Sequence, residues 1–450
     1  MSTQSQNQAG LRWLVAIVAD KRFQRPALPR GVAFWVAAAI AFAVFAANTA
    51  ASPLYRVYQA QFRFSATTLT ALFAAYILVL LVTLLFFGSL SDYVGRRRVI
   101  AAGLAAGAVG CVLFLIAHGV GPLFAARALQ GLAVGLISGA ASAALFDLRP
   151  DGGAAPLVSS AVPTGGQALG AIGASALAQY APAPTHLVWW LLLGAFVIGI
   201  PAVLAMQEPG RARPGAVASL RPRVSVPREA RGAFAVAVPG LVGVWALGGF
   251  YLSLGPSLAA QLLHSENLLW GGVLIFLLTG LGAAASAAFR KTDPSSVMLG
   301  GCLTLSAGAL VTFAAIETNT PAVLLIGTAV AGLGFGPAFM GAYRAAVALA
   351  PSDDRAGLIT AVYIVGYLAT GIPAVIAGIA TSQYGLHDTA LVYSVAVAAL
   401  TAAAAGTFLV RRLRAAGGPS RGARYPDPPP GPGTVPPCPP IPPRARGAEA

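Results

Sequence analysis

About twelve long apolar stretches divide this chain of 450 residues, and they constrain its fold more than any other feature. A helix needs roughly 20 apolar residues to cross the hydrocarbon core of a bilayer. A soluble domain needs a polar surface, yet 57% of these residues are hydrophobic and only 10% are charged. We therefore predict an all-α integral membrane protein. Its expected transmembrane helices are residues 33–52, 67–87, 99–117, 122–146, 155–179, 187–206, 233–256, 268–289, 296–316, 322–349, 357–381 and 388–410.

The basic residues between these stretches indicate how the chain is oriented. The net charge is +15, and nearly all lysines and arginines precede the first span or follow spans two, six, eight and twelve. Alternating spans place these segments on one face, and positively charged loops remain in the cytoplasm. We expect a multi-pass protein of the cytoplasmic membrane with both termini inside. The lipid bilayer is an expected partner, and because the charge follows the topology we expect no nucleic-acid binding.

Changes in composition predict five segments. Residues 207–232 are rich in Arg and Pro and form a central cytoplasmic loop between two six-helix halves, 31–206 and 233–412. Residues 1–30 are polar and basic and form a cytoplasmic N-terminal tail. Residues 413–450 are rich in Pro and Arg, and we expect a disordered cytoplasmic tail there because such a composition cannot bury a core.

The sequence contains no recognisable catalytic or cofactor-binding motif. Cys111 and Cys302 lie within spans and Cys438 lies in the tail, a spacing that indicates neither a disulfide framework nor a metal site. The chain has no Gly-x-x-x-x-Gly-Lys-Ser/Thr loop, no His-Glu-x-x-His pair and no Gly-x-Ser-x-Gly elbow. We predict that the protein is not an enzyme and needs no cofactor or metal.

The two halves repeat each other. A shift of 201 positions places Gly131-Leu-x-x-Gly135 on Gly332-Leu-x-x-Gly336, and other Pro and Gly positions coincide at the same shift. Six spans in each half give both copies the same orientation in the membrane. We therefore predict a parallel repeat about an axis along the membrane normal.

A short charged turn, GSLSDYVGRRR at residues 88–98, joins the second and third spans. Gly88 allows the two helix ends to approach closely, and Gly95 permits a sharp turn with a positive φ. Asp92 is placed to meet the positive end of a neighbouring helix. A turn this short also requires both helices to end at the same membrane face.

This turn resembles the signature loop of the major facilitator superfamily of secondary transporters, G-x-L-x-D-x-x-G-R-[RK]-x. Arg127-x-x-Gln130-Gly131, in the fourth span, resembles a second motif of that family. The resemblance covers about residues 30–412 and implies two six-helix halves arranged as parallel pseudo-repeats. The fifth span departs from the pattern, because it lacks the Gly-Pro pair that is common in antiporters of the family.

The resemblance also implies that the turn closes the cytoplasmic side of the protein. Asp92 would meet the start of span eleven near residues 353–357, and Arg96 or Arg97 would reach Asp147 at the end of span four. The alternative is that the three arginines only fix the topology, as we expect for Arg98. The predicted gating residues are Gly88, Asp92, Gly95, Arg96, Arg97 and Asp147.

A substrate cavity between the halves, lined by spans one, four, seven and ten, is implied by the same resemblance. Arg127 is charged inside a span, where it makes a substrate or coupling contact or acts as a scaffold or snorkelling arginine. Each aromatic candidate has the alternative of packing in the core or facing lipid. The candidate substrate-binding residues are Asn48, Arg127, Gln130, Trp245, Phe250, Tyr251, Tyr363 and Tyr367.

We expect a monomeric transporter that moves a small organic molecule by alternating access. Aromatic and amide groups with one arginine suit an apolar or amphipathic substrate, including one with negative charge. Efflux of a drug-like compound or metabolite is the first hypothesis, uptake of a metabolite or nutrient is the second, and a non-transporting membrane sensor or scaffold is the third. No acidic residue falls in the middle of a span, so the sequence identifies no carrier for a coupling ion such as a proton.

Overall fold

The computed structural model describes residues 28–149, 154–210, 219–222, 224–348 and 355–417, and this part of the chain is helical. No β-strand occurs among these residues, and an isolated bridge joins Leu28 to Met206. The all-α prediction is confirmed. The first half contains α2 (Arg30–Phe62), α3 (Ala66–Phe87), α4 (Ser91–Val94), α5 (Arg96–Leu115), α6 (Val120–Leu148), α7 (Ala155–Tyr180) and α8 (Leu187–Leu204). The second half contains α10 (Arg228–Ser253), α11 (Gly255–Leu263), α12 (Leu269–Ala288), α13 (Pro294–Glu317), α14 (Pro321–Ala348), α15 (Arg355–Tyr384) and α16 (Leu386–Gly417).

Each predicted span corresponds to one long helix of the described chain, and eleven of these helices are long and apolar enough to cross a membrane. The exception is α7, whose 26 residues would reach about 39 Å but include several Ser, Thr and Gln side chains. This helix packs against α2 in its own half and against α12 in the other half. Its polar residues are therefore tolerated because much of its surface meets protein.

The structure reproduces the repeat in its helix contacts. A Cβ atom added to Gly131 would lie 2.5 Å from the carbonyl oxygen of Tyr76, and one added to Gly332 would overlap the carbonyl oxygen of Leu277. Tyr76 and Leu277 are themselves 201 positions apart, so both partners of the contact follow the same shift. Each half thus uses a glycine to bring its fourth long helix onto its second.

The halves differ where their first long helices meet a proline. α2 continues through Pro53 to Phe62, whereas α10 stops at Ser253 and α11 begins at Gly255, directly before Pro256. The predicted span 233–256 is therefore wrong at its end, because Gly255 and Pro256 interrupt the hydrogen bonds that would extend α10.

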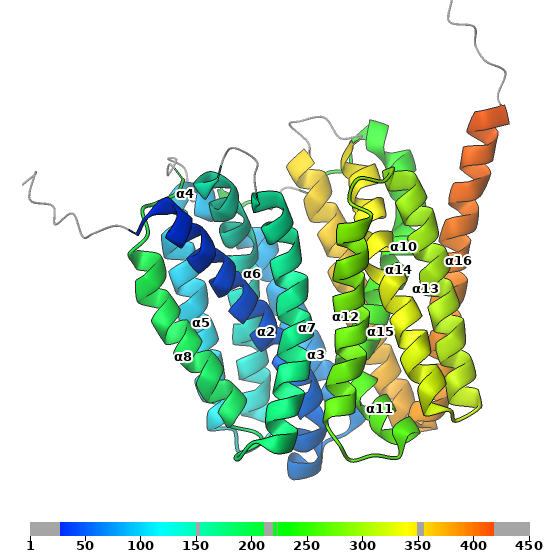
Figure 1. Cartoon of the computed structure of the whole chain (residues 1–450), viewed down its shortest axis with the longest axis horizontal. Helices are drawn as coiled ribbons and strands as arrows, with labels where there is room; N and C mark the ends of the chain where they lie inside the picture. The colour runs from blue at the N-terminus through cyan, green and yellow to red at the C-terminus, as the bar shows by residue number, and fades with distance from the viewer. Residues whose placement is uncertain (1–27, 150–153, 211–218, 223, 349–354, 418–450) are drawn as a thin grey trace, which may run out of the picture. The chain divides into compact units, whose positions relative to one another are not determined.

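Two pairs of helices join the halves within the compact unit Met1–Phe408, namely α7 with α12 and α3 with α15 (Figure 1). We call these pairs the two seams. Residues from Leu409 onward form a second unit, of which the structure describes only the end of α16.

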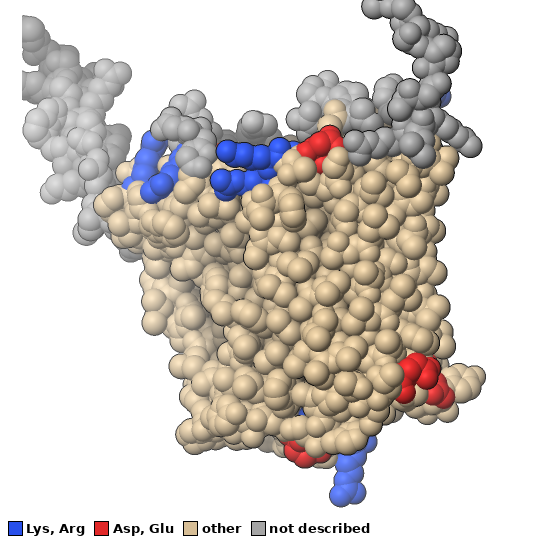
Figure 2. Space-filling view, turned by 45° about the vertical axis from the view of Figure 1, so that its right-hand side comes forward, with Lys and Arg blue, Asp and Glu red and all other residues tan. Residues whose placement is uncertain are grey.

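Basic side chains gather at one end of the helices, which we call the turn face because it carries residues 88–98 (Figure 2). The described basic residues at this face are Arg30, Arg96, Arg97, Arg98, Arg149, Arg221, Arg228, Arg231, Arg290, Lys291 and Arg344. Of the described lysines and arginines, Arg56 and Arg63 lie at the opposite face. The charge asymmetry predicted from the sequence is therefore present in the structure.

Candidate functional site

The charged turn folds as the short helix α4 and the start of the long helix α5, joined by one glycine. α4 ends at Val94, Gly95 has a φ of 105°, and α5 begins at Arg96. A side chain rarely adopts this φ, so the positive φ predicted for Gly95 is confirmed and explains the residue. The turn thereby presents the first backbone N–H groups of α5 beside the Arg96 side chain.

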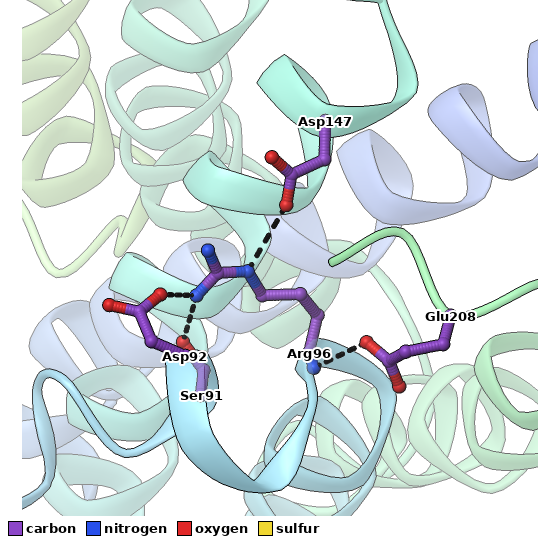
Figure 3. A network of polar contacts seen from close by, with 5 residues as sticks. All are labelled: Ser91, Asp92, Arg96, Asp147 and Glu208. Atoms are coloured by element: carbon purple, nitrogen blue, oxygen red, sulfur yellow. Dashed lines mark hydrogen bonds and ion pairs between the residues drawn. The ribbon is translucent and has the colours of Figure 1, made fainter. Parts of the chain in front are cut away.

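Arg96 is the centre of a polar network at the turn face (Figure 3). Its NH1 donates to Ser91 Oγ at 2.7 Å and pairs with Asp92 Oδ1, while its Nε donates to Asp147 Oδ2 at 3.3 Å. Arg96 therefore fulfils the predicted contact with Asp147. Arg97 instead donates through Nε to the carbonyl oxygen of Val203 at 3.2 Å.

Glu208 completes this network and was missed by the sequence analysis. Its Oε1 accepts a hydrogen bond from the backbone N–H of Arg96 at 2.6 Å. A carboxylate at the first turn of α5 is stabilised by the unpaired N–H groups and by the helix dipole. The link ties the segment after α8 to the turn. The sequence carried no positional signal for it, because Glu208 is more than 100 residues away from Arg96.

The second half retains only part of this arrangement. Asp293, the counterpart of Asp92, caps α13 by accepting a hydrogen bond from the backbone N–H of Ser296 at 2.9 Å. Arg344, near the end of α14, donates to the carbonyl oxygens of Arg290 and Thr292. In the first half, Arg96 thus pairs with carboxylates. In the described part of the second half, Arg344 donates to backbone carbonyl oxygens.

The predicted contact between Asp92 and the start of span eleven falls partly outside the described residues, which omit 349–354. Among the described residues, the Asp92 carboxylate is paired with Arg96.

A second polar group lies deep in the first half, and we call it the central cluster: Asn48, Tyr55, Tyr76, Arg127 and Gln130. Arg127 is only 1% exposed, and its NH1 donates to Gln130 Oε1 at 2.5 Å and to the backbone oxygen of Asn48 at 3.2 Å. Gln130 Nε2 donates to the carbonyl oxygen of Ala47. The guanidinium lies 4.3 Å from the ring centre of Tyr76 and 5.9 Å from that of Tyr55. The structure thus brings Asn48, Arg127 and Gln130 into contact.

Five half-buried aromatic residues of the second half form what we call the aromatic wall: Trp245, Phe339, Tyr343, Tyr363 and Tyr367. The ring of Trp245 makes edge contacts with Tyr367 at 4.9 Å and with Phe339 at 5.6 Å between centroids. Tyr363 stacks on Tyr367 at 6.1 Å, and Phe339 lies 5.9 Å from Tyr343. The wall runs from the middle of α15 toward the turn face.

The central cluster and the aromatic wall meet at the seam between α3 and α15. Next to Tyr76 on α3, the Ile77 side chain would lie 3.4 Å from a Cβ added to Gly371, one helical turn beyond Tyr367 on α15. Tyr76 covers Arg127, so the buried cation lies close to this seam.

Two of the candidate residues lie elsewhere. Phe250 stacks on Tyr393 of α16 at 4.6 Å, and the Tyr251 hydroxyl lies 3.0 Å from the Thr328 hydroxyl of α14. Both are buried inside the second half. Conversely, Tyr55, Tyr76, Phe339 and Tyr343 were not predicted, although Tyr55 lies two helical turns from Asn48 on the same face of α2.

The described seam contacts lie between the middle of the bundle and the face opposite the turn. In one seam, Thr67 Oγ1 lies 2.9 Å from Ser382 Oγ, and Thr67 Oγ1 donates to the carbonyl oxygen of Gly378 at 3.3 Å. Beside the other seam, the backbone N–H of Leu268 donates to Gln179 Oε1 at 2.9 Å, and Arg56 pairs with Glu266 at 3.1 Å. The two halves are therefore held together by polar contacts at this face.

Comparison with known proteins supports the architecture. The family model described as the Major Facilitator Superfamily matches residues 34–292, more than half of the chain. A search of curated proteins finds no match.

Solved structures share the fold at low sequence identity. A mutant of the peptide transporter POT in complex with sulfate is 14% identical with a TM-score of 0.69, covering 86% of this chain and 95% of that one. A mutant of the nucleoside transporter NupG is 12% identical with a TM-score of 0.65, covering 84% and 99%. A POT family transporter in complex with 5-aminolevulinic acid is 13% identical with a TM-score of 0.65, covering 88% and 97%. These likenesses concern the fold.

Proposed function

Because the chain belongs to the Major Facilitator Superfamily, we propose that it is a secondary transporter that moves a small organic molecule across the cytoplasmic membrane by alternating access. The observation that carries this proposal is the one-sided packing of the two seams. Their described contacts hold the halves together between the middle and the face opposite the turn. The aromatic wall begins where those contacts end, so a bound molecule would be reached from the turn face.

The orientation follows from charge. Arginine and lysine gather at the turn face, and such loops remain in the cytoplasm. The structure then corresponds to the state closed toward the outside. The network around Arg96 would keep the turn in the same conformation while the two halves rotate relative to each other. The proposed direction of transport is efflux of a drug-like compound or metabolite.

Flux measurements test this proposal. Cells with and without the protein would be exposed to a panel of small organic compounds and scored for accumulation and resistance. Lower accumulation in expressing cells would support efflux, and higher accumulation would favour the alternative, uptake. A purified protein that moves no compound across proteoliposome membranes in either direction would contradict the transporter assignment.

Replacing Arg96 by Gln should lower the transport rate about tenfold while the protein still reaches the membrane, because the change removes charge-assisted hydrogen bonds to two carboxylates. The matched control is Arg98→Gln, since Arg98 is a neighbouring exposed arginine of the same turn. Initial rates per amount of membrane-inserted protein give the comparison. Equal rates in the two variants would remove the network from the gating mechanism.

A further inference from the structure

Both halves contain buried polar atoms that have no hydrogen-bond partner. Among the described residues, four buried side-chain polar atoms lack a hydrogen-bond partner: the Tyr55 hydroxyl, Arg127 Nε, Trp245 Nε1 and the Thr381 hydroxyl. The first three belong to the central cluster and the aromatic wall. Arginine and tryptophan nitrogens can only donate, so the group that satisfies them is an acceptor.

The charge of Arg127 points to the same chemistry. Its described partners, Asn48 and Gln130, offer neutral oxygens, and the described residues contain no salt bridge to it. Every acidic residue described within a helix lies in the first or last turn of that helix, or in the short α4. A buried guanidinium is costly unless a negative group pairs with it. The described residues around Arg127 thus provide no negative charge to pair with it. A bound anion would provide one.

We infer that the transported molecule is an organic anion. Its negatively charged group binds Arg127, with the Tyr55 hydroxyl as a second donor, and its apolar body packs on the aromatic wall. The inference rests on the proposed function and adds the chemical class of the substrate. Carboxylate groups suit the site because arginine pairs with them through two parallel hydrogen bonds.

The contacts between the halves explain how one molecule reaches both parts of this site. Tyr76 covers the guanidinium at 4.3 Å on α3, and α15, which packs on α3 through Gly371 and Ile77, carries Tyr367 in contact with Trp245 at 4.9 Å. The charged group therefore lies in the first half and the apolar body in the second. The free indole N–H of Trp245 offers a donor to a further acceptor on the body.

A binding experiment with matched probes tests the charge requirement. Purified protein would be heated with phenylacetate, phenylacetamide or phenethylamine, and with naphthylacetate and its amide and amine, at equal concentrations. We expect the carboxylates to raise the midpoint of thermal unfolding and their neutral and cationic counterparts to leave it unchanged, since a ligand stabilises the state it binds. Equal or greater stabilisation by the amides or amines, or no stabilisation by either carboxylate, would overturn the inference.

Single-residue variants test where on the protein the carboxylates bind. Arg127→Gln should weaken carboxylate affinity at least about tenfold, and Arg127→Lys should retain part of it, because a charged hydrogen bond is lost in the first and kept in the second. Arg63→Gln is the control, since it removes an exposed arginine at the face opposite the turn. If Arg127→Gln does not fold, Trp245→Phe tests the wall, where we expect weaker binding of carboxylates. Unchanged carboxylate affinity in the folded Arg127→Gln protein, or in Trp245→Phe when it replaces that variant, would contradict the site.

Uptake of the same labelled probes into proteoliposomes separates this inference from the proposed function. Transport of the amines without the carboxylates would refute an anionic substrate but would still support the proposed transport function. Selective stabilisation by carboxylates without movement of any probe would support the anion site and count against the transport of these molecules.

Discussion

A disulfide between Thr67→Cys and Ser382→Cys is expected to stop transport, and reduction of that disulfide is expected to restore it. The two hydroxyl oxygens lie 2.9 Å apart across the seam between α3 and α15. Alternating access requires this seam to open, so a covalent bond across it would hold the protein closed at that face. Transport should fall to the background of empty vesicles after oxidation. Vesicle flux before and after reductant, with gel shifts to measure cross-linking, gives the result.

The two single variants serve as controls for the cross-link. Thr67→Cys alone and Ser382→Cys alone should transport at nearly the rate of the parent under oxidation, because neither can form the bond. The native Cys111 and Cys302 are buried, and Cys438 in the C-terminal tail is replaced by Ser in the parent and in every variant, so that no native thiol competes for the bond. Full transport by a completely cross-linked protein would show that the seam stays closed throughout the cycle.

Replacing Gly301 by Ala should sharply reduce the yield of folded protein, whereas Gly300→Ala should not. A Cβ at Gly301 would overlap the backbone nitrogen of Ala338 and lie 2.9 Å from the carbonyl carbon of Pro337, so α13 would be pushed away from α14. Overpacking of this kind costs about 1–3 kcal/mol or more, since a backbone cannot move aside as a side chain can.

The neighbouring position is a close control for the same helix. A Cβ at Gly300 meets no atom within 4 Å, so this substitution should leave stability within about 1 kcal/mol of the parent. Monodisperse yield and the midpoint of thermal unfolding in detergent give the comparison. Similar values for the two variants would mean that α13 and α14 do not pack as closely as described.

The fold was predictable because apolar length, charge asymmetry and the repeat all depend on residues read in order along the chain. Boundaries were less predictable. α2 was expected to end at residue 52 but continues to Phe62, because the amphipathic residues after Pro53 still form backbone hydrogen bonds. Hydropathy measures transfer into lipid and carries no signal for that extension.

The site was predictable only where the interacting residues are close together in the sequence. Asn48, Arg127 and Gln130 come together because Arg127 and Gln130 are three residues apart on α6 and an unpaired buried arginine needs polar neighbours. Trp245 and Tyr251 are six residues apart, a rotation of about 240° on a helix, so they point in different directions. This helical geometry was sufficient to predict that Tyr251 does not belong to the aromatic wall.

Contacts between distant segments were not predictable from one sequence. Glu208 reaches the turn from the end of the first half, and Ser382 reaches Thr67 from the other half. Their positions depend on how the helices pack, and no local pattern of residues encodes those distances.

The polar character of α7 has a consequence for how the protein is made. α7 is the one long helix of the described chain that falls short of the hydropathy typical of a spanning helix, so contact with helices already in the membrane favours its insertion. Its partner α2 has been synthesised by then, and the Thr49 hydroxyl of α2 donates to the carbonyl oxygen of Gln167 at 2.8 Å. Its other partner, α12, emerges from the ribosome about 90 residues later, as read from the helix bounds. A ribosome-bound chain that ends after α8 therefore contains an α7 whose α12-facing side is not yet covered by protein. The second half then completes the burial of α7.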